Sequence, residues 1–174
     1  MRRLAILGST GSIGRNTLEV VRESGGELGV EALAAGSNLD VLLPQILEFR
    51  PRLVSVRTEK LRDELAGMLA EEGGPRPELV CGAAGNVAVA TCDTAGTVVS
   101  AAVGVAGLEA TYQAVKQGKR VALANKEVLV AAGELVMQAA QQSGAELLPV
   151  DSEHNGVHQC LRAAGRREEV RRLI

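Results

Sequence analysis

The stretch "LAILGSTGSIGRNTLEVVRES", residues 4–24, joins a short apolar run, a glycine-rich turn and a segment of helical period. The glycines at 8, 11 and 14 have G-x-x-G-x-x-G spacing rather than the more common G-x-G-x-x-G. A strand-to-helix turn aims backbone N–H groups and the positive end of the helix at an anion, and glycines let the main chain approach it closely. The pattern predicts a phosphate-binding turn; a tight turn without a ligand is the alternative.

The rest of the chain repeats this alternation of apolar and helical segments. Apolar runs typical of buried strands lie at 4–7, 30–35, 52–56, 78–81, 97–103, 120–124 and 145–150. Segments of helical period lie at 13–24, 42–50, 59–72, 107–118 and 133–144. Continuously apolar strands that alternate with helices indicate a parallel sheet covered on both faces. The predicted fold class is therefore α/β, with a doubly wound, Rossmann-like parallel sheet.

Glycine and proline positions refine this prediction. Gly118 and Gly144 each follow a helical segment and precede a strand, where a residue in the left-handed region is expected. Residues 73–77, GGPRP, predict a loop. Pro44 is tolerable only if its helix begins near Asp40, because a proline beyond the first turn removes a backbone hydrogen bond.

The composition argues against several classes of protein. A net charge of -2 and 23% charged residues describe an ordinary surface. Phe49 and Tyr112 are the two aromatic residues, too few for the stacking by which single-stranded nucleic acid is usually held. Cys81, Cys92 and Cys160 include no C-x-x-C pair and are predicted to be small buried thiols in a reducing cytosol. We therefore expect no nucleic-acid partner and no zinc or redox cysteine site.

The amino terminus, MRRLAILGST, has an apolar run of four residues, too short for a signal peptide. No stretch reaches the roughly 18 uninterrupted apolar residues of a membrane span. The sequence thus predicts a soluble cytoplasmic protein without a membrane partner.

The end of the second apolar run bears on the choice of dinucleotide. VEALAA is followed by Gly36, Ser37 and Asn38. An acidic residue here usually binds the free ribose 2′-hydroxyl of NAD and would repel the 2′-phosphate of NADP. No carboxylate closes this run, which favours NADP, although Asp40 lies close in sequence. Ser37 or Asn38 is also suited to cap the next helix, a role compatible with a phosphate contact.

A second polar cluster follows the run RVALA as Asn125, Lys126 and Glu127. Ligands of open α/β sheets bind beyond the carboxyl ends of the strands, so these side chains are expected at the cofactor crevice. A lysine there can hold a substrate oxygen or phosphate as a point charge. The alternative is a solvated first helical turn, but lysine is slightly disfavoured at a helix N-terminus.

A third cluster, Asp151 and Glu153, follows the run AELLPV. Two carboxylates this close repel each other unless they share a proton or cation, which indicates Mg²⁺ or Mn²⁺. They are equally suited to cap and begin a helix that starts near Asn155. His154 and His158 have helical spacing for a zinc pair, but no third ligand is evident and the H-E-x-x-H pattern is absent.

Five motifs span essentially the whole chain: GSTGSIG (8–14), AAGSN (34–38), VGVAGL (103–108), LANKE (123–127) and PVDSEHN (149–155). Together and in this order they closely resemble the 1-deoxy-D-xylulose 5-phosphate reductoisomerase family. LANKE followed by PVDSEHN is far more specific than the glycine turn. The resemblance implies an oxidoreductase and isomerase that uses NADPH and Mg²⁺ or Mn²⁺. Such an enzyme converts 1-deoxy-D-xylulose 5-phosphate to 2-C-methyl-D-erythritol 4-phosphate in non-mevalonate isoprenoid biosynthesis.

The resemblance also implies roles for individual residues. Those matching the family's cofactor contacts are Thr10, Gly11, Ser12, Ile13, Gly36, Ser37, Asn38, Asn125 and Glu127. Ser37 stands where some members have lysine, so the family pattern does not show what neutralises the 2′-phosphate here. His158 stands where members often have a bulky apolar residue, a change that bears on helix packing.

The same resemblance assigns the catalytic residues. Asp151 and Glu153 match metal ligands, while Lys126, Ser152 and Glu153 match substrate contacts. Lys126, Asp151 and Glu153 are therefore the expected catalytic set, acting on a phosphorylated sugar.

The family is considerably longer than this chain. We expect an NADPH-binding domain at 1–150 and the beginning of a catalytic domain at 151–174, whose strand-like end EVRRLI (169–174) has no turn after it. This predicts an amino-terminal piece, inactive alone, of an enzyme that the family implies is a homodimer.

Two other functional classes stay open. One is a different NADP-linked oxidoreductase, such as a semialdehyde dehydrogenase using Cys160 as nucleophile. The other is a non-catalytic nucleotide-binding module.

Overall fold

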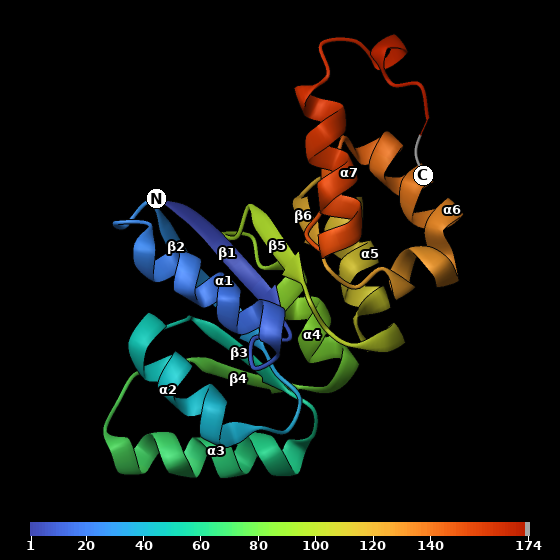
Figure 1. Ribbon diagram of the computed structural model, residues 1–174. Coiled ribbons are helices and arrows are strands. Elements are labelled where there is room, and N and C mark those ends of the chain that lie inside the picture. The colour runs from blue at the N-terminus through green and yellow to red at the C-terminus, as the bar shows by residue number, and fades with distance from the viewer. Residues whose placement is uncertain (173–174) are drawn as a thin grey trace.

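The computed structural model describes residues 1–172. Within them, seven strands form one parallel sheet in the order β4-β3-β2-β1-β5-β6-β7 (Figure 1). The strands are β1 (Arg2–Leu7), β2 (Leu28–Ala34), β3 (Leu53–Val56), β4 (Glu78–Cys81), β5 (Thr97–Ser100), β6 (Arg120–Leu123) and β7 (Leu147–Pro149). The chain runs outward from β1 to β4, returns to β5 beside β1 and continues outward to β7. This arrangement confirms the predicted doubly wound α/β fold.

Helices cover both faces of the sheet. One face carries α1 (Ser12–Glu23), α2 (Leu39–Phe49) and α3 (Glu59–Glu72), and the other carries α4 (Gly82–Thr91), α5 (Leu108–Lys116) and α6 (Glu127–Ser143). The seventh helix, α7 (Ser152–Ala163), lies beside the β6–β7 end of the sheet (Figure 1). Two short 3-10 helices are η1 (Gly104–Gly107) and η2 (Arg167–Glu169).

The central strand β1 shows why its sequence is apolar without alternation. Leu4 and Ile6 pack into the core beneath α1, α2 and α3, whereas Ala5 and Leu7 pack into the core beneath α4, α5 and α6. All four side chains are buried. A strand covered on both faces needs apolar residues at every position, as the run LAIL predicts.

Most of the predicted boundaries are confirmed. Each of the seven apolar runs contains a strand, although the run at 97–103 ends as β5 at Ser100 and leads into η1. Gly118 and Gly144 have positive φ angles of 71° and 73°, as expected of residues that end helices. Residues 74–77 have no regular structure, and Gly73 ends α3 with φ 62°.

The predicted start near Asp40 is confirmed to within one residue, since α2 begins at Leu39. Pro44 nevertheless lies inside the helix, beyond its first turn. Asn38 caps this helix by accepting a hydrogen bond from Val41 N–H at 3.1 Å, and that cap fixes the start. The helix core is secured instead by Leu42 and Ile46, which are fully buried. Tertiary packing here outweighs the local cost of the proline.

Helix α4 was not among the segments with a helical period. Its sequence, GAAGNVAVAT, is small and apolar on most sides, and the helix packs against β1, β2 and β3 as well as α5. A helix buried on several sides has no polar stripe, so periodicity cannot reveal it. In α6 the predicted segment at 133–144 begins where the backbone departs from helical geometry at Ala132, with φ -146° and ψ 31°.

Two other expectations change. All three cysteines are free thiols, but Cys160 is exposed and Cys81 and Cys92 are only partly buried, so the prediction of buried thiols is wrong. Cys160 is exposed because α7 has no buried residue.

The run at 169–174 begins in η2 and contains no strand through residue 172, and its last two residues lie outside the described part of the chain. Among the described helices, none has the length and apolar character that a membrane crossing requires.

Gly14→Ala is expected to lower the free energy of unfolding by about 2 kcal/mol or more, because overpacked backbone must shift. A methyl group at position 14 would lie 2.3 Å from the Gly8 carbonyl oxygen and 2.5 Å from Ser9 Cα. Chemical denaturation monitored by circular dichroism measures the change. The matched control is Gly67→Ala in α3, where a methyl group would meet no described atom within 4 Å. That control should stabilise the protein by about 0.5–1 kcal/mol. Equal effects of the two substitutions would contradict this packing.

Candidate functional site

A cleft of about 440 Å³ opens beyond the carboxyl ends of the central strands. Its walls are the turn after β1, the end of β2, the first turn of α4 and the segment that follows β5. The strands β1 and β5 are neighbours although their connections leave in opposite directions, which makes this the topological switch point of the sheet. Ligands of open α/β sheets bind at such a point.

The glycine-rich turn forms the floor of this cleft. Gly8 has φ 86°, and a Cβ there would lie 2.5 Å from the Ala101 carbonyl oxygen at the end of β5. The Gly11 N–H donates to the Gly8 carbonyl at 3.1 Å, and Gln45 Nε2 in α2 donates to the Ser9 carbonyl at 3.0 Å. The turn is thus stabilised by its own Gly11–Gly8 hydrogen bond, by the close approach of Gly8 to the end of β5 and by the buried Gln45 side chain of α2.

The first turn of α1 is open to a ligand. The N-cap residue is Gly11, and among the described residues no side chain caps the free N–H groups that follow. Thr10 and Gly11 line the cleft, whereas Ser12 is exposed and Ile13 packs partly into the core. Free N–H groups at the positive end of a helix are suited to an anionic group.

Gly36, Ser37 and Asn38, the residues predicted to bind the cofactor at the end of β2, lie in different environments. Gly36 lines the cleft. Ser37 and Asn38 are exposed, and the Asn38 side chain caps α2, which is the alternative role considered for it. Of the three predicted residues, Gly36 alone lines the cleft.

The LANKE segment places its three polar residues in different environments. Asn125 is buried, and its Nδ2 donates to the Gly104 carbonyl in η1 at 2.6 Å. The Asn125 Oδ1 atom is buried without a hydrogen-bond partner among the described residues. Lys126 is the N-cap of α6 and is half exposed, and Glu127 begins the helix in an exposed position.

The PVDSEHN segment meets LANKE in space. Lys126 Nζ lies 3.8 Å from Glu153 Oε2, and Lys126, Asp151 and His154 line one apolar pocket beside β7. Asp151 caps α7, which begins at Ser152 rather than near Asn155. Ser152 and Glu153 are exposed in its first turn. The capping role is therefore confirmed for Asp151, and it leaves the second carboxylate oxygen for another partner.

The Asp151 carboxylate has a lowered pKa. Its partial burial alone would raise the pKa, but hydrogen bonds to Oδ2 from the His154 ring and the His154 backbone N–H outweigh that effect. Asp151 is thus held as an anion at neutral pH beside the Lys126 and Glu153 pair.

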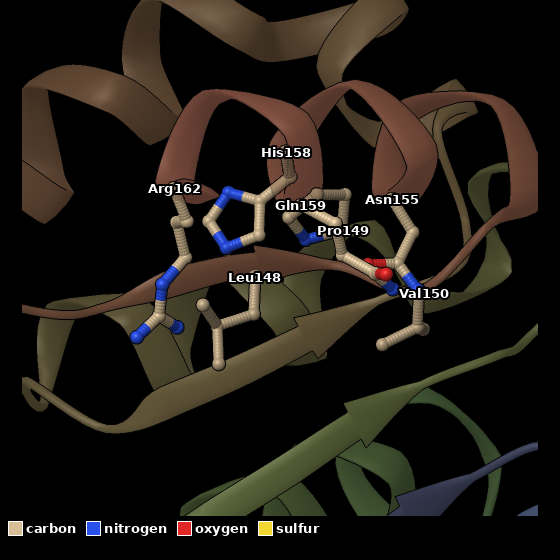
Figure 2. Close-up of a pocket in the computed structure, with 7 residues that line it drawn as sticks. All are labelled: Leu148, Pro149, Val150, Asn155, His158, Gln159 and Arg162. Carbon is tan, nitrogen blue, oxygen red and sulfur yellow. The ribbon is translucent and has the colours of Figure 1, made fainter. Parts of the chain in front are cut away.

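His158 belongs to a different surface from His154. It lines a groove between α7 and β7 of about 410 Å³, together with Arg162 and Leu148 (Figure 2). Figure 2 shows the His158 ring and the Arg162 side chain extending from α7 toward Leu148 on the strand. His158 therefore faces this groove, and His154 contacts Asp151 instead.

The structure gathers the predicted residues into two groups. Thr10, Gly11 and Gly36 line the cleft, and Lys126, Asp151 and Glu153 lie together near β7. Sequence reasoning missed Arg57 and Asn86, which also line the cleft. Arg57 directly follows β3, so the rule that places ligands at strand ends could have identified it. Asn86 lies in α4, which has no sequence signal of its own.

A parallel sheet with a glycine-rich turn at its switch point defines a nucleotide-binding domain of the Rossmann class. Residues 4–133 match the family model described as 1-deoxy-D-xylulose 5-phosphate reductoisomerase. The chain belongs to this family. The enzyme of that name from Solibacter usitatus is 56% identical over 177 residues, covering 100% of this chain and 44% of the relative.

Solved structures agree with this assignment. One described as DOX-P reductoisomerase in complex with NADPH, fosmidomycin and magnesium has a TM-score of 0.87 and 40% identity, covering 92% of this chain and 39% of that one. The Zymomonas mobilis reductoisomerase in complex with NADPH has a TM-score of 0.85 and 39% identity, covering 91% of this chain and 41% of that one. The chain therefore spans less than half the length of these relatives.

His154→Ala is expected to raise the pKa of Asp151 toward the ordinary aspartate value, because it removes the ring N–H donor. A carboxylate whose folded pKa is lowered stabilises the protein above its unfolded pKa of about 4, and this contribution is lost as pH falls through the folded pKa. Carboxyl-carbon NMR titration measures the pKa. His158→Ala is the control, since His158 faces the groove of Figure 2, and it should leave the Asp151 pKa unchanged. An unchanged Asp151 pKa in His154→Ala would refute the role of the ring.

Proposed function

We propose that this chain is the NADPH-binding part of a 1-deoxy-D-xylulose 5-phosphate reductoisomerase. The full enzyme would convert that substrate to 2-C-methyl-D-erythritol 4-phosphate in isoprenoid biosynthesis, using Mg²⁺ or Mn²⁺. The observation that carries the proposal is the open first turn of α1 at the switch-point cleft, in a chain of this family. The cytoplasmic location, the homodimer and the domain boundary at 150/151 stay predictions.

The cleft fits a dinucleotide on its own chemistry. Glycine at positions 8 and 14 lets the backbone of the turn pack closely, because a Cβ at either position would collide with other backbone atoms. The free N–H groups after Gly11 suit a pyrophosphate, and the buried Asn125 Oδ1 is an acceptor that needs a donor. The carboxamide of a nicotinamide ring is such a donor. We propose that Thr10, Gly11, Ser12 and Ile13 hold the phosphates and that Asn125 and Glu127 orient the nicotinamide end.

The Lys126, Asp151 and Glu153 group fits a hard divalent cation. Magnesium is commonly bound by one or two carboxylates with several waters retained. Asp151 is already an anion, and among the described residues no group of three or more His, Cys, Asp or Glu side chains converges. When bound, the metal would supply Lewis-acid polarisation of substrate oxygens. We therefore propose two metal ligands from this chain, with further ligands from the rest of the enzyme.

The other residues of this group would position the substrate. Lys126 is half exposed and paired only loosely with Glu153 at 3.8 Å, so its charge is accessible to a substrate oxygen. Ser152 is exposed in the first turn of α7, where its hydroxyl is accessible to a phosphorylated sugar. Glu153 would exchange its ion pair for contacts with metal and substrate.

The two other classes fit less well. A semialdehyde dehydrogenase would need an activated cysteine at the cofactor, but Cys160 lies exposed on α7 and is not among the residues that line the cleft. A non-catalytic nucleotide-binding module would have no use for the paired carboxylates, so metal binding separates it from the reductoisomerase.

The 174-residue protein is expected to bind NADPH about ten-fold more tightly than NADH, because the 2′-phosphate adds a charge-assisted contact. Fluorescence titration with each cofactor measures both affinities. No NADPH oxidation with 1-deoxy-D-xylulose 5-phosphate is expected from a chain that covers 44% of its relatives. Equal affinities would contradict the cofactor assignment. Measurable turnover would show instead that the remaining segments are unnecessary.

Asp151→Asn is expected to weaken Mn²⁺ binding by about ten-fold or more, because a ligating charge is lost. Electron paramagnetic resonance of free Mn²⁺ gives the affinity directly. Asp93→Asn, at an exposed carboxylate before β5, is the control and should leave the affinity unchanged. If both variants bind like the unmodified protein, Asp151 is not a ligand, and the non-catalytic module becomes the better interpretation.

A further inference from the structure

Arg57 lies at the end of β3, beside the end of β2. The β2–β3 pairing continues past the strands, since Ala35 N–H donates to the Ser55 carbonyl at 2.9 Å and Arg57 N–H donates to the Gly36 carbonyl at 3.1 Å. These bonds fix the Arg57 backbone next to Gly36. The location of Arg57 therefore follows from the register of the sheet.

The Arg57 guanidinium group also lies over Gly36. A Cβ placed on Gly36 would be 3.4 Å from Arg57 Nη2, so the side chain turns back toward the end of β2. Both residues line the switch-point cleft. The absence of a side chain at Gly36 lets the guanidinium group approach the backbone where the adenosine ribose of a dinucleotide is bound in this fold class.

Charge distinguishes Arg57 from the rest of the cleft wall. Of the described residues that line the cleft, Arg57 alone carries a charge. Arg57 is exposed, and no carboxylate among residues 1–172 forms an ion pair with it. The adjacent Ser37 provides a hydroxyl but no charge, and Asn38 is engaged in capping α2. A planar guanidinium with free N–H donors is the group best suited to bind a phosphate dianion.

We propose that Arg57 binds the 2′-phosphate of NADPH and makes the cleft selective for NADPH over NADH. This inference rests on the proposed function, since it concerns the same cofactor. In this fold class the adenosine ribose is usually bound by a residue at the end of β2. Arg57 follows β3, the neighbouring strand. The α2 and α3 N-termini, capped by Asn38 and Thr58, flank Gly36 and Arg57 in sequence and add favourable partial charge.

The test is the ratio of NADPH to NADH affinity in Arg57→Gln, measured by fluorescence titration of the 174-residue protein. NADPH binding should weaken by about ten-fold or more, as expected when a charge-assisted hydrogen bond is lost, while NADH binding stays unchanged. The affinity for 2′-AMP, which carries the phosphate without the nicotinamide, should fall in parallel. Arg76→Gln is the control, because Arg76 is an exposed arginine before β4 at the opposite end of the strands.

A second variant tests the role of charge rather than shape. The double change Arg57→Gln with Ser37→Lys restores a cation beside Gly36 and should recover most of the NADPH preference. Unchanged selectivity in Arg57→Gln, with the unmodified protein still preferring NADPH, would overturn the inference and leave the proposed function intact. Equal loss of NADPH and NADH binding would also overturn it, since the arginine would then be structural. If the unmodified protein binds neither cofactor, both the inference and the proposed function fail.

Discussion

The close contact between the backbone of the β1–α1 turn and its neighbours is the constraint on which this structure depends. Gly8 lies against the end of β5, and Gly14 lies against Gly8 and Ser9. At either glycine a Cβ atom would collide with these backbone atoms. These contacts bring α1 down onto the sheet and place its N-cap residue, Gly11, in the wall of the cleft. They also hold β1 and β5 together at the point where the chain changes direction across the sheet.

The location of the site follows from that constraint. Strands β2 to β4 extend from one side of β1, and β5 to β7 extend from the other, so the two sets of loops separate above β1 and β5. The separation produces a cleft without any dedicated binding element. Residues that follow four different strands then reach one region: Gly8 after β1, Gly36 after β2, Arg57 after β3 and Ala102 after β5. The two polar motifs after β6 and β7 meet through Lys126 and Glu153 in the same way.

The sequence predicted those structural features that depend on the local pattern of apolar residues and glycines. All seven strands, the fold class and the turn were predictable because buried strands are continuously apolar and the turn needs glycines. Helix α4 was not predictable, since burial on several sides removes its period, and the start of α2 depended on the Asn38 cap rather than on Pro44. For the candidate site, the strand-end rule predicted Gly36, which lines the cleft, and Lys126 and Asp151, which line the pocket beside β7. It could not show that the guanidinium of Arg57 turns back over Gly36, because that depends on the β2–β3 register.

Amide NMR spectra of the 174-residue protein, recorded during addition of NADPH, test most directly whether the switch-point cleft is the cofactor site. Binding in this cleft predicts the largest shift changes at Gly8, Gly11, Gly36 and Ala102, with small changes along α3 and at the amino ends of the strands. Changes concentrated in the groove between α7 and β7 shown in Figure 2, or no changes at saturating NADPH, would contradict it.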